Sequence, residues 1–360
     1  MLVATPSIIS VATHYKIFDF PGERKLHKDH TPRLGGMAIF IAFVFSFFLW
    51  RPPIHEPSLR YLMAALLILF LVGLKDDVVG MSPVKKLGLQ MLVTIIVVID
   101  GSGATRLTGM HGIFNIFDIP YWASILLTVF TIIVVTNAFN LIDGIDGLAA
   151  GLGLIATTTF GFWFYSTDNP VLASMTFALG GALLGILVFN FAPARIFSGD
   201  CGSLLMGFLI AIFAVRFNEI NKDYVMKYLT SNSGNSPFSG IAGEDAPDLM
   251  IYSAPAFAVA VLIVPLYDTL RSFIVRLSKG KSPFEGDTNH IHHRLLFVGL
   301  TAPQVCIVLF AVNILFIVVA GIFRDMSPNK LLLLIVSLAV FFDLILFVIK
   351  KRKDRKVDLK

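Results

Sequence analysis

The chain has 360 residues, of which 56% are hydrophobic and only 15% are charged, and its mean hydropathy is +0.79. A soluble globular protein carries about 25% charged residues, so this composition excludes a water-soluble fold and indicates a polytopic membrane protein. The net charge of +5 would also suit nucleic-acid binding. In a membrane protein, however, basic residues first determine orientation, and we expect no nucleic-acid partner.

Apolar runs long enough to cross a bilayer predict ten spans. Residues 1–13 are apolar but too short to cross alone, so we expect an incomplete first span there. The prediction is an all-α polytopic protein with about 10–11 transmembrane helices, in which residues 1–350 form a single transmembrane catalytic domain and 351–360 a basic cytoplasmic tail. The ten expected spans are 35–50, 58–74, 87–105, 121–138, 147–165, 170–190, 203–215, 249–270, 301–323 and 331–349.

The basic residues divide unequally between the two sets of loops. If the loops alternate sides, 21 of the 29 Lys and Arg residues fall on one side, which identifies that side as cytoplasmic. Residues 216–248 then face outward, and their many turn-forming residues predict a flexible loop insertion without catalytic groups. The loop at 271–300, which carries three histidines, is expected in the cytoplasm. The cytoplasmic set is 14–34, 75–86, 139–146, 191–202, 271–300 and 350–360.

Polar clusters stand at the ends of the expected spans. An ion-coupled transporter would keep ionisable residues within the membrane, where a charge is costly and is retained for an ion path. Here the clusters lie in loops assigned to the cytoplasm, and four clusters from distant parts of the chain on one face indicate a single site at that interface. They comprise Asp76 and Asp77; Asn140, Asp143 and Asp146; Asp200; and His290, His292 and His293.

The acidic clusters each have a simpler alternative. Asp76 and Asp77 could be solvated loop acids, but they follow an apolar helix, whose negative end disfavours a carboxylate by about 0.3–1 kcal/mol. We therefore expect a compensating cation, either Lys75 or a metal. The segment 137–147 has two amides and two acids at intervals of three, with glycines between them, which exceeds what a capping turn requires.

Asp200 and the histidines suggest phosphate chemistry. Asp200 could cap the following span, or supply a single carboxylate to a divalent cation that also binds a diphosphate. The histidines could form a transition-metal site, but they lack cysteine ligands and helical i, i+4 spacing. Donation to phosphate oxygens suits them better, because His and Arg stabilise charge that develops as a phosphoanhydride breaks. A solvated loop cluster is the remaining alternative.

Together these segments resemble the polyprenyl-phosphate N-acetylhexosamine-1-phosphate transferases, over about residues 24–296. The form His-Ile-His-His, preceded by Ser-Pro-Phe at 282–284, is similar to the WecA/TagO branch, which uses UDP-GlcNAc, rather than the MraY branch, where three consecutive histidines are typical. The matching segments are Thr31-Pro-Arg-Leu-Gly-Gly36, Gly73-Leu-Lys-Asp-Asp77, 137–147, Phe189-Asn190 with Gly199-Asp200, and His290-Ile-His-His293.

The resemblance implies roles for particular residues. Asp200 is expected to ligate Mg²⁺, with Mn²⁺ as the alternative ion, and Asp76 and Asp77 to belong to the catalytic acids, one as a base toward the lipid phosphate. Asp143, Asp146 and Asn140 are expected to line the diphosphate and metal region, and Asn190 and Phe197 to contact uracil. Contacts to the sugar diphosphate are expected from His290, the catalytic histidine, and from His292, His293 and Arg294, with Lys28 as a basic contact in the first cytoplasmic loop.

The implied reaction transfers GlcNAc-1-phosphate from UDP-GlcNAc to undecaprenyl phosphate, releases UMP and begins a cell-envelope polysaccharide. Within this class, the alternative is another UDP-N-acetylhexosamine, or phospho-MurNAc-pentapeptide as the transferred group. The alternative from another class is an ion-coupled transporter. Direct attack and an aspartyl-phosphate intermediate both remain open. The expected location is the bacterial inner (cytoplasmic) membrane with its lipids as partners, and a homodimer is an open alternative.

Overall fold

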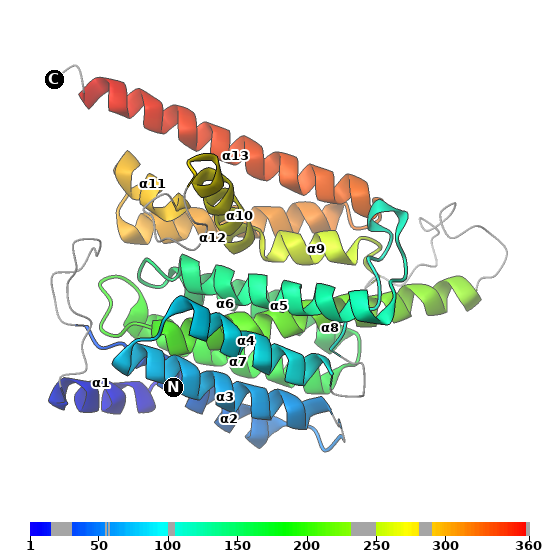
Figure 1. The fold of residues 1–360 in the computed structure, drawn as a ribbon, viewed down its shortest axis with the longest axis horizontal. Coiled ribbons are helices and arrows are strands. Elements are labelled where there is room, and N and C mark those ends of the chain that lie inside the picture. The colour runs from blue at the N-terminus through cyan, green and yellow to red at the C-terminus, as the bar shows by residue number, and fades with distance from the viewer. Residues whose placement is uncertain are drawn as a thin grey trace.

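The structure, a computed structural model, describes residues 1–15, 31–54, 56, 58–99, 105–231, 250–280 and 290–357. Over this part of the chain it contains helices and no strand, with thirteen α-helices and one 3-10 turn at Ile113–Asn115 (Figure 1). The predicted all-α fold class is confirmed. Its helices are α1 Ala4–His14, α2 Gly35–Trp50, α3 Ser58–Val79, α4 Pro83–Val98, α5 Tyr121–Ile142, α6 Leu148–Ser166, α7 Pro170–Asn190, α8 Gly199–Ser231, α9 Ala254–Val261, α10 Ile263–Ser278, α11 Ile291–Val298, α12 Ala302–Ile322 and α13 Pro328–Val357.

Six helices of the described chain are long and apolar enough to cross a membrane: α5, α6, α7, α8, α12 and α13. The bent pair α9 and α10 counts as a seventh, and α2 is a shorter apolar helix. The remaining expected spans, 58–74 and 87–105, fall largely on α3 and α4. Each predicted span therefore coincides with a helix or a bent pair of helices, and the chain is a multi-pass membrane protein.

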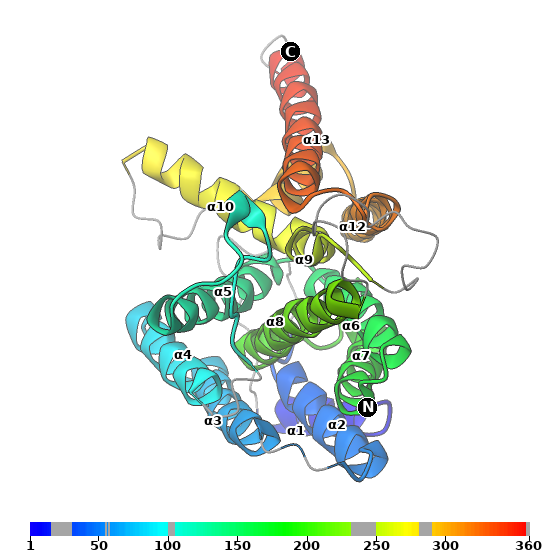
Figure 2. The ribbon, with the colours of Figure 1, turned by 90° about the vertical axis from the view of Figure 1, so that its right-hand side faces the viewer.

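Helix α8 occupies the centre of the bundle. It packs against α5, α3, α2, α6 and α9, which surround it when the molecule is viewed along the bundle (Figure 2). Within its apolar part, Gly199–Val225, 89% of the residues of the most apolar window are buried, against 17% for α13. Because α8 is enclosed by other helices, the position of its first turn is determined by several neighbours at once.

Residues 216–231 correct one sequence prediction. They continue α8 to Ser231, whereas we expected the whole of 216–248 to be a loop. The extension has tertiary partners: Glu219 accepts hydrogen bonds from the backbone and hydroxyl of Thr108, at 2.9 and 2.7 Å, and the ammonium of Lys222 lies 2.7 Å from Asp118. Contacts with the 105–120 segment therefore support helix beyond the apolar run. Residues 232–249 lie outside the described part of the chain.

The expected span 249–270 is also not one straight helix. Helices α9 and α10 meet at Leu262 with a bend of 82°, and α10 points away from the bundle (Figure 2). Pro265 has no N–H to donate to the carbonyl of Val261, four residues earlier. The side chain of Asn313 in α12 donates to that carbonyl instead, at 3.0 Å. A freed carbonyl inside a membrane needs such a partner, so this contact stabilises the bend.

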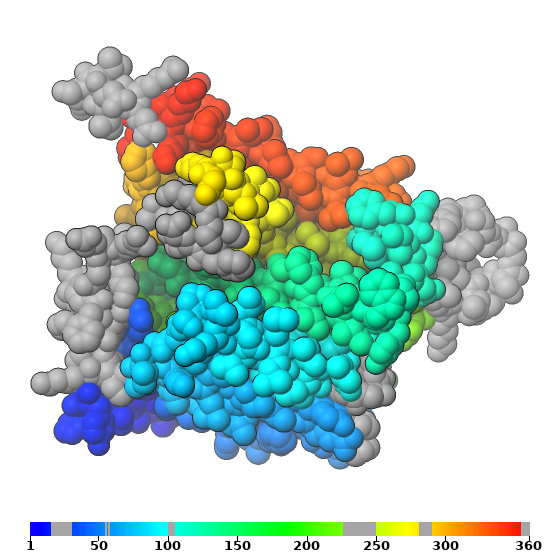
Figure 3. Space-filling view, viewed as in Figure 1, coloured from blue at the N-terminus to red at the C-terminus, as the bar shows by residue number. Residues whose placement is uncertain are grey.

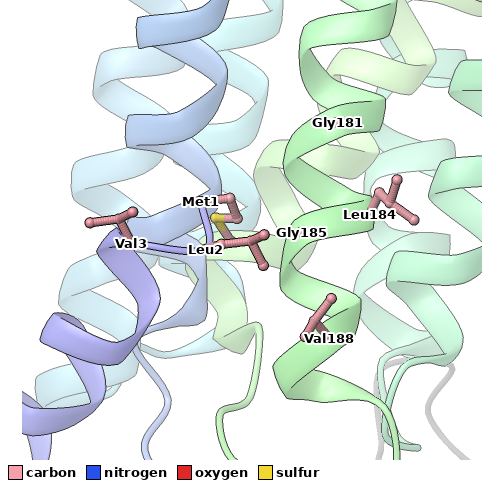
Figure 4. A pocket seen from close by; sticks show the side chains of 7 residues that line it. All are labelled: Met1, Leu2, Val3, Gly181, Leu184, Gly185 and Val188. Carbon is pink, nitrogen blue, oxygen red and sulfur yellow. The ribbon is translucent and has the colours of Figure 1, made fainter.

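A hollow of about 540 Å³ lies between residues 1–3 and one face of α7, as Figure 4 shows. Its lining is apolar and carries no ionisable side chain: Met1, Leu2, Val3, Gly181, Leu184, Gly185 and Val188. The ionisable side chains of the sequence motifs lie elsewhere, near the ends of the helices. On the face of the molecule shown in Figure 3, α10 stands above the surface formed by α4 and α5.

Candidate active site

The start of α8 and the residues just before it pack directly against three glycines from the sequence motifs. A Cβ atom on Gly73 would collide with the backbone of Cys201, and one on Gly36 would collide with the backbone of Gly202. The backbone N–H groups of Gly35 and Gly36 also donate to the carbonyls of Phe197 and Ser198, at 2.9 and 2.8 Å. The glycines at 35–36 and at 73 are thus needed because the α8 backbone passes directly over them.

This close approach lets Asp77 cap α8 from another helix. One carboxylate oxygen of Asp77 accepts a hydrogen bond from the backbone N–H of Asp200, at 2.7 Å, and the other accepts from Cys201, at 3.0 Å. The first N–H groups of a helix have no partner within the helix, and the positive end of the helix dipole favours a carboxylate. Asp77 therefore lies in the last turn of α3 but stabilises the start of α8.

Lys86, at the start of α4, joins two of the acids. Its ammonium lies 3.0 Å from a carboxylate oxygen of Asp76 and donates to Asp200. The amide of Asn140 donates to the same oxygen of Asp200, at 2.6 Å, and to the hydroxyl of Ser203, at 2.8 Å. The expected cation beside the acids is therefore Lys86 and not Lys75, which is exposed.

Asp143 differs from the other acids of this group. Within the described residues it makes no hydrogen bond or ion pair, and it follows the last residue of α5. Burial, followed by the negative charges of Asp200, Asp77 and Asp146, raises the pKa of Asp143 well above its ordinary value. We call Asp76, Asp77, Asp143 and Asp200, with Lys86 and Asn140, the carboxylate cluster. Asp76, Asp77 and Asp200 are engaged in capping or ion pairing, whereas among the described residues Asp143 is not.

Two further predicted residues hold the neighbouring loops together. Asp146 is buried and accepts a hydrogen bond from the backbone N–H of Ala194, at 2.9 Å. The amide of Asn190 accepts from Gly147, at 3.0 Å, and donates to the carbonyl of Ile196, at 2.8 Å. Gly147 has a φ of +79°, a conformation that favours glycine. The predicted uracil contact at Asn190 would therefore compete with hydrogen bonds that fix this turn.

Phe197, the other residue expected near uracil, follows this turn and is half-buried. Its backbone N–H donates to the carbonyl of Pro32, at 2.8 Å. The segment 31–36 and the strand-like stretch before α8 are thus joined by hydrogen bonds on both sides of Phe197. The ring is held beside the start of α8, close in sequence to Asp200.

The histidine motif begins at α11 and is anchored by Asp268 of α10. One carboxylate oxygen of Asp268 accepts from the backbone N–H of Ile291, at 2.6 Å, and the other lies 2.8 Å from Nδ1 of His290. Arg276, which can only donate, lies 3.5 Å from Nε2 of His290. We therefore assign the hydrogen of His290 to Nδ1. His290 is buried, and both of its ring nitrogens lie within hydrogen-bond distance of protein groups.

His292 connects this motif to the carboxylate cluster. A Cβ atom at position 144 would lie only 2.7 Å from Nε2 of His292, so the glycine between Asp143 and Ile145 leaves room for this ring. His292 is 1% exposed, and its Nδ1 has no hydrogen-bond partner. Burial lowers the pKa of His292 to about 3, so the ring is neutral at physiological pH. His293 packs beside it, with 4.3 Å between ring centroids.

One predicted contact is not brought into this arrangement, and another falls outside the described residues. Arg294 turns to α13, where it pairs with Asp343 and is 3% exposed. Its predicted contact with the sugar diphosphate would require it to leave a buried ion pair. Lys28 lies outside the described residues.

The donor set fits a magnesium ion that is shared with a substrate. Among the residues that the structure describes, no three His, Cys, Asp or Glu side chains are placed to enclose a metal ion. Mg²⁺ is commonly bound by only one or two carboxylates, with phosphate and water as the other ligands. Asp200 is 30% exposed and provides such a carboxylate beside Asp143, although Lys86 and Asn140 already contact one of its oxygens.

Sequence reasoning missed three charged residues of the site. Lys86 was counted only for topology, although it follows the Asp76–Asp77 pair by less than three helical turns. Asp268 and Asp343 lie inside the expected spans 249–270 and 331–349, so the acids are not confined to the ends of the spans. A single acid within an apolar span is itself a functional signal, and this rule could have found both.

Comparisons with known proteins agree with the motifs. The sequence profile described as glycosyl transferase family 4 matches residues 59–218. A protein of Bacillus subtilis named "Probable undecaprenyl-phosphate N-acetylglucosaminyl 1-phosphate transferase" is 29% identical over 353 residues, which cover 96% of this chain and 88% of that protein. The undecaprenyl-phosphate alpha-N-acetylglucosaminyl 1-phosphate transferase of Escherichia coli is 28% identical, covering 92% of this chain and 83% of its own.

A third relative extends the match to another lipid. The decaprenyl-phosphate N-acetylglucosaminephosphotransferase of Mycobacterium tuberculosis is 30% identical over 324 residues, covering 85% of this chain and 76% of its own. These relatives are transferases, and the transporter alternative gains no support from them. The matched region contains α3 to α5 and the first turns of α8, which carry the whole carboxylate cluster. The chain therefore belongs to glycosyl transferase family 4, among the membrane phosphotransferases that attach N-acetylhexosamine 1-phosphate to polyprenyl phosphates.

Proposed function

We propose that the chain transfers N-acetylglucosamine 1-phosphate from UDP-GlcNAc to undecaprenyl phosphate and releases UMP. The observation that carries the proposal is the close approach of the His292 ring to Gly144, the residue that follows Asp143, which brings the histidine motif next to the carboxylate cluster. The names of the relatives supply the sugar and the lipid. UDP is proposed as the activating group because a phosphoanhydride must break for this transfer to proceed.

The position of the cluster suits the two substrates. Asp77 lies near the end of α3, Lys86 at the start of α4, and Asp200 in the first turn of α8. The unequal distribution of basic residues assigns this end of the bundle to the cytoplasm. A nucleotide sugar arrives there from the aqueous side, whereas a polyprenyl tail stays among lipid chains. We accordingly propose the bacterial inner membrane as the location.

In the proposed reaction an oxygen of the lipid phosphate attacks the β-phosphorus of UDP-GlcNAc. A bond forms between that oxygen and the β-phosphorus, the bond from the β-phosphorus to the bridging oxygen breaks, and UMP leaves with the bridging oxygen. Burial and the neighbouring acids raise the pKa of Asp143, which makes it a stronger base than an ordinary aspartate toward the proton of the lipid phosphate. Direct attack is the simpler route, because Asp76, Asp77 and Asp200 are held by partners that a covalent phosphoaspartate would displace.

One cation and two neutral hydrogen-bond donors, each from a different helix, are placed to act on the phosphates. Lys86 stands between Asp76 and Asp200, where its ammonium can also attract a phosphate. Asn140 holds the Asp200 carboxylate in place through its amide. Neutral His292 can donate one hydrogen bond to a phosphate oxygen but carries no charge. Mg²⁺ bound at Asp200 would neutralise the diphosphate and stabilise the leaving UMP.

The test is UMP release by purified protein supplied with undecaprenyl phosphate, UDP-GlcNAc and Mg²⁺. We expect the wild type to form UMP and lipid-linked GlcNAc in equal amounts, and Asp200→Asn to lose most of this activity. Replacing UDP-GlcNAc by UDP-GalNAc or UDP-MurNAc-pentapeptide identifies the sugar donor. Absence of UMP from wild-type protein with all three donors would overturn the proposed reaction, and full activity of Asp200→Asn would overturn the metal assignment.

A further inference from the structure

Helix α13 contacts the histidine-bearing helix α11 at two levels. At the first level, the carboxylate of Asp343 pairs with Arg294 of α11 and lies 3.0 Å from Nε of Arg271 in α10. A second bond runs from Arg294 to the backbone carbonyl of Asp343, at 3.4 Å. One acid of α13 thus connects three helices.

The second level is the end of α11, two to three turns further along α13. The ammonium of Lys353 donates to the carbonyls of Phe297 and Val298, both at 2.9 Å. The ammonium of Lys350 lies 5.2 Å from the centre of the Phe297 ring. The last carbonyls of a helix have no partner within it, and a cation near them is favourable. Lys353 therefore caps α11 from outside, as Asp268 does at its other end.

Burial makes the ion pair at Asp343 necessary for α11. Arg294 is 3% exposed and Asp343 is 18% exposed, and Asp343 lies in an apolar stretch of α13 that otherwise suits lipid. An acid in such a stretch is kept only with a partner. Removing it would leave the guanidinium of Arg294 buried without its carboxylate, which is far more costly than loss of an exposed pair.

The ion pair also controls where the histidines lie. Arg294 directly follows His293, and His292 has only the space that Gly144 leaves, with a nitrogen 2.7 Å from the position of an added Cβ. A helix of eight residues cannot keep this register by itself, because so short a helix is marginal without tertiary contacts. Any shift of α11 would therefore move both rings relative to Asp143.

We propose that Asp343 is a positioning residue of the active site, and that the C-terminal half of α13 is a brace holding the histidines of α11 against the carboxylate cluster. Asp343 acts through Arg294 and does not touch the substrate. The proposal rests on the proposed function where activity is measured. Hydrogen exchange tests the brace without any substrate.

The first experiment compares Asp343→Ala with Asp343→Glu in purified full-length protein. Asp325→Ala is the matched control, because Asp325 is an exposed acid just before α13 and is only 3.9 Å from Arg324 in a surface pair. We expect kcat/KM for UDP-GlcNAc to fall roughly 10- to 100-fold in Asp343→Ala, since small displacements of catalytic groups cost this much. Asp343→Glu should recover most of the loss, and Asp325→Ala should match wild type.

Double variants distinguish positioning from general stability. If Asp343 acts through α11, adding Asp343→Ala to His293→Ala should cost little more than the worse single change. When Asp343→Ala is combined with Asn140→Ala on α5, the two fold-losses in kcat/KM should instead multiply. Multiplication in both backgrounds, or unchanged kcat/KM in Asp343→Ala, would overturn the positioning role.

Hydrogen exchange of residues 291–298 tests the brace without turnover. We expect faster exchange in Asp343→Ala than in wild type or Asp325→Ala, with residues 254–261 of α9 unchanged. Equal exchange of α11 in all three proteins would overturn the brace. Wild-type protein that releases no UMP but shows the expected exchange would overturn the proposed function and leave the brace supported.

Discussion

Asp77 and Asp200 lie 123 positions apart, yet the carboxylate of Asp77 accepts a hydrogen bond of 2.7 Å from the backbone N–H of Asp200. The two acids therefore cannot be treated as equivalent members of one catalytic group. Asp77 holds the turn from which the Asp200 side chain projects toward Lys86 and Asn140. A change at Asp77 acts on both the stability of α8 and the placement of its first side chains.

Replacing this cap should weaken the start of α8. We expect Asp77→Ala to lower the free energy of unfolding by about 1 kcal/mol, the usual cost of a lost N-terminal cap, and to lower activity as well. Asp77→Asn keeps one oxygen acceptor and should lie between Ala and wild type in thermal stability. Thermal unfolding in detergent, alongside UMP release, measures both effects. Equal melting temperatures for Asp77→Ala and wild type would contradict the capping role.

The contact between Gly144 and His292 predicts that even a methyl group is harmful there. In Gly144→Ala the new Cβ would lie 2.7 Å from Nε2 of His292, so the ring or the turn must move. We expect activity to fall at least roughly tenfold, because the histidine motif is displaced relative to the carboxylate cluster. Gly88→Ala and Gly181→Ala are controls of the same size, since nothing lies within 4 Å of an added Cβ at either site. The interpretation fails if Gly144→Ala is as active as these controls.

Lys86 should be essential whereas its neighbour Lys85 is not. Lys86→Met keeps the length of the side chain but removes the charge between Asp76 and Asp200, leaving both acids without their cation. We expect kcat to fall about 10²- to 10³-fold, as for loss of one electrostatic group in an active site. Lys85→Met, at an exposed position, should retain normal turnover. Similar rates for the two variants would show that Lys86 serves no purpose in catalysis.

The proton-accepting role of Asp143 predicts the direction of the pH dependence. Since burial and nearby acids raise its pKa, Asp143 is protonated at low pH, and activity should rise as the pH increases through that value. Asp143→Asn should lower kcat about 10²- to 10⁴-fold and flatten this rise. His292→Gln should leave the pH at which activity rises unchanged, because His292, with a pKa of about 3, is already neutral. A pH profile of kcat from 5 to 9 tests this, and an unchanged rise in Asp143→Asn would assign the titration to another group.

The helices were predictable because each is preceded or followed by a break in an apolar run. Their irregularities were not. The bend at Leu262 depends on Asn313 from another helix, which satisfies the carbonyl that Pro265 frees. Likewise, residues 216–231 are polar enough to predict a loop, but Glu219 and Lys222 find partners in the 105–120 segment. Both features depend on contacts between distant segments, which periodicity along one segment does not contain.

The same distinction applies to the site. Polar residues at helix ends indicated which segments meet, and the structure brings Asp76, Asp77, Asn140 and Asp200 together. Their individual chemistry was not readable, because it is determined by partners such as Lys86 and Asp268. Residue type alone could not distinguish Asp77, which caps a helix, from Asp143, which has no partner among the described residues. The roles assigned to these acids remain predictions for the experiments above.

The enclosure of α8 by neighbouring helices has a consequence for biogenesis. Asp200 depends on Asp77 of α3, Lys86 of α4 and Asn140 of α5, so a chain whose helices have entered the membrane but have not yet packed together leaves this carboxylate without its partners. Charge at the start of α8 is thus compensated only once its neighbours have assembled around it. We expect catalytic competence to appear late and abruptly during folding, which makes turnover a sensitive reporter of whether the bundle is complete.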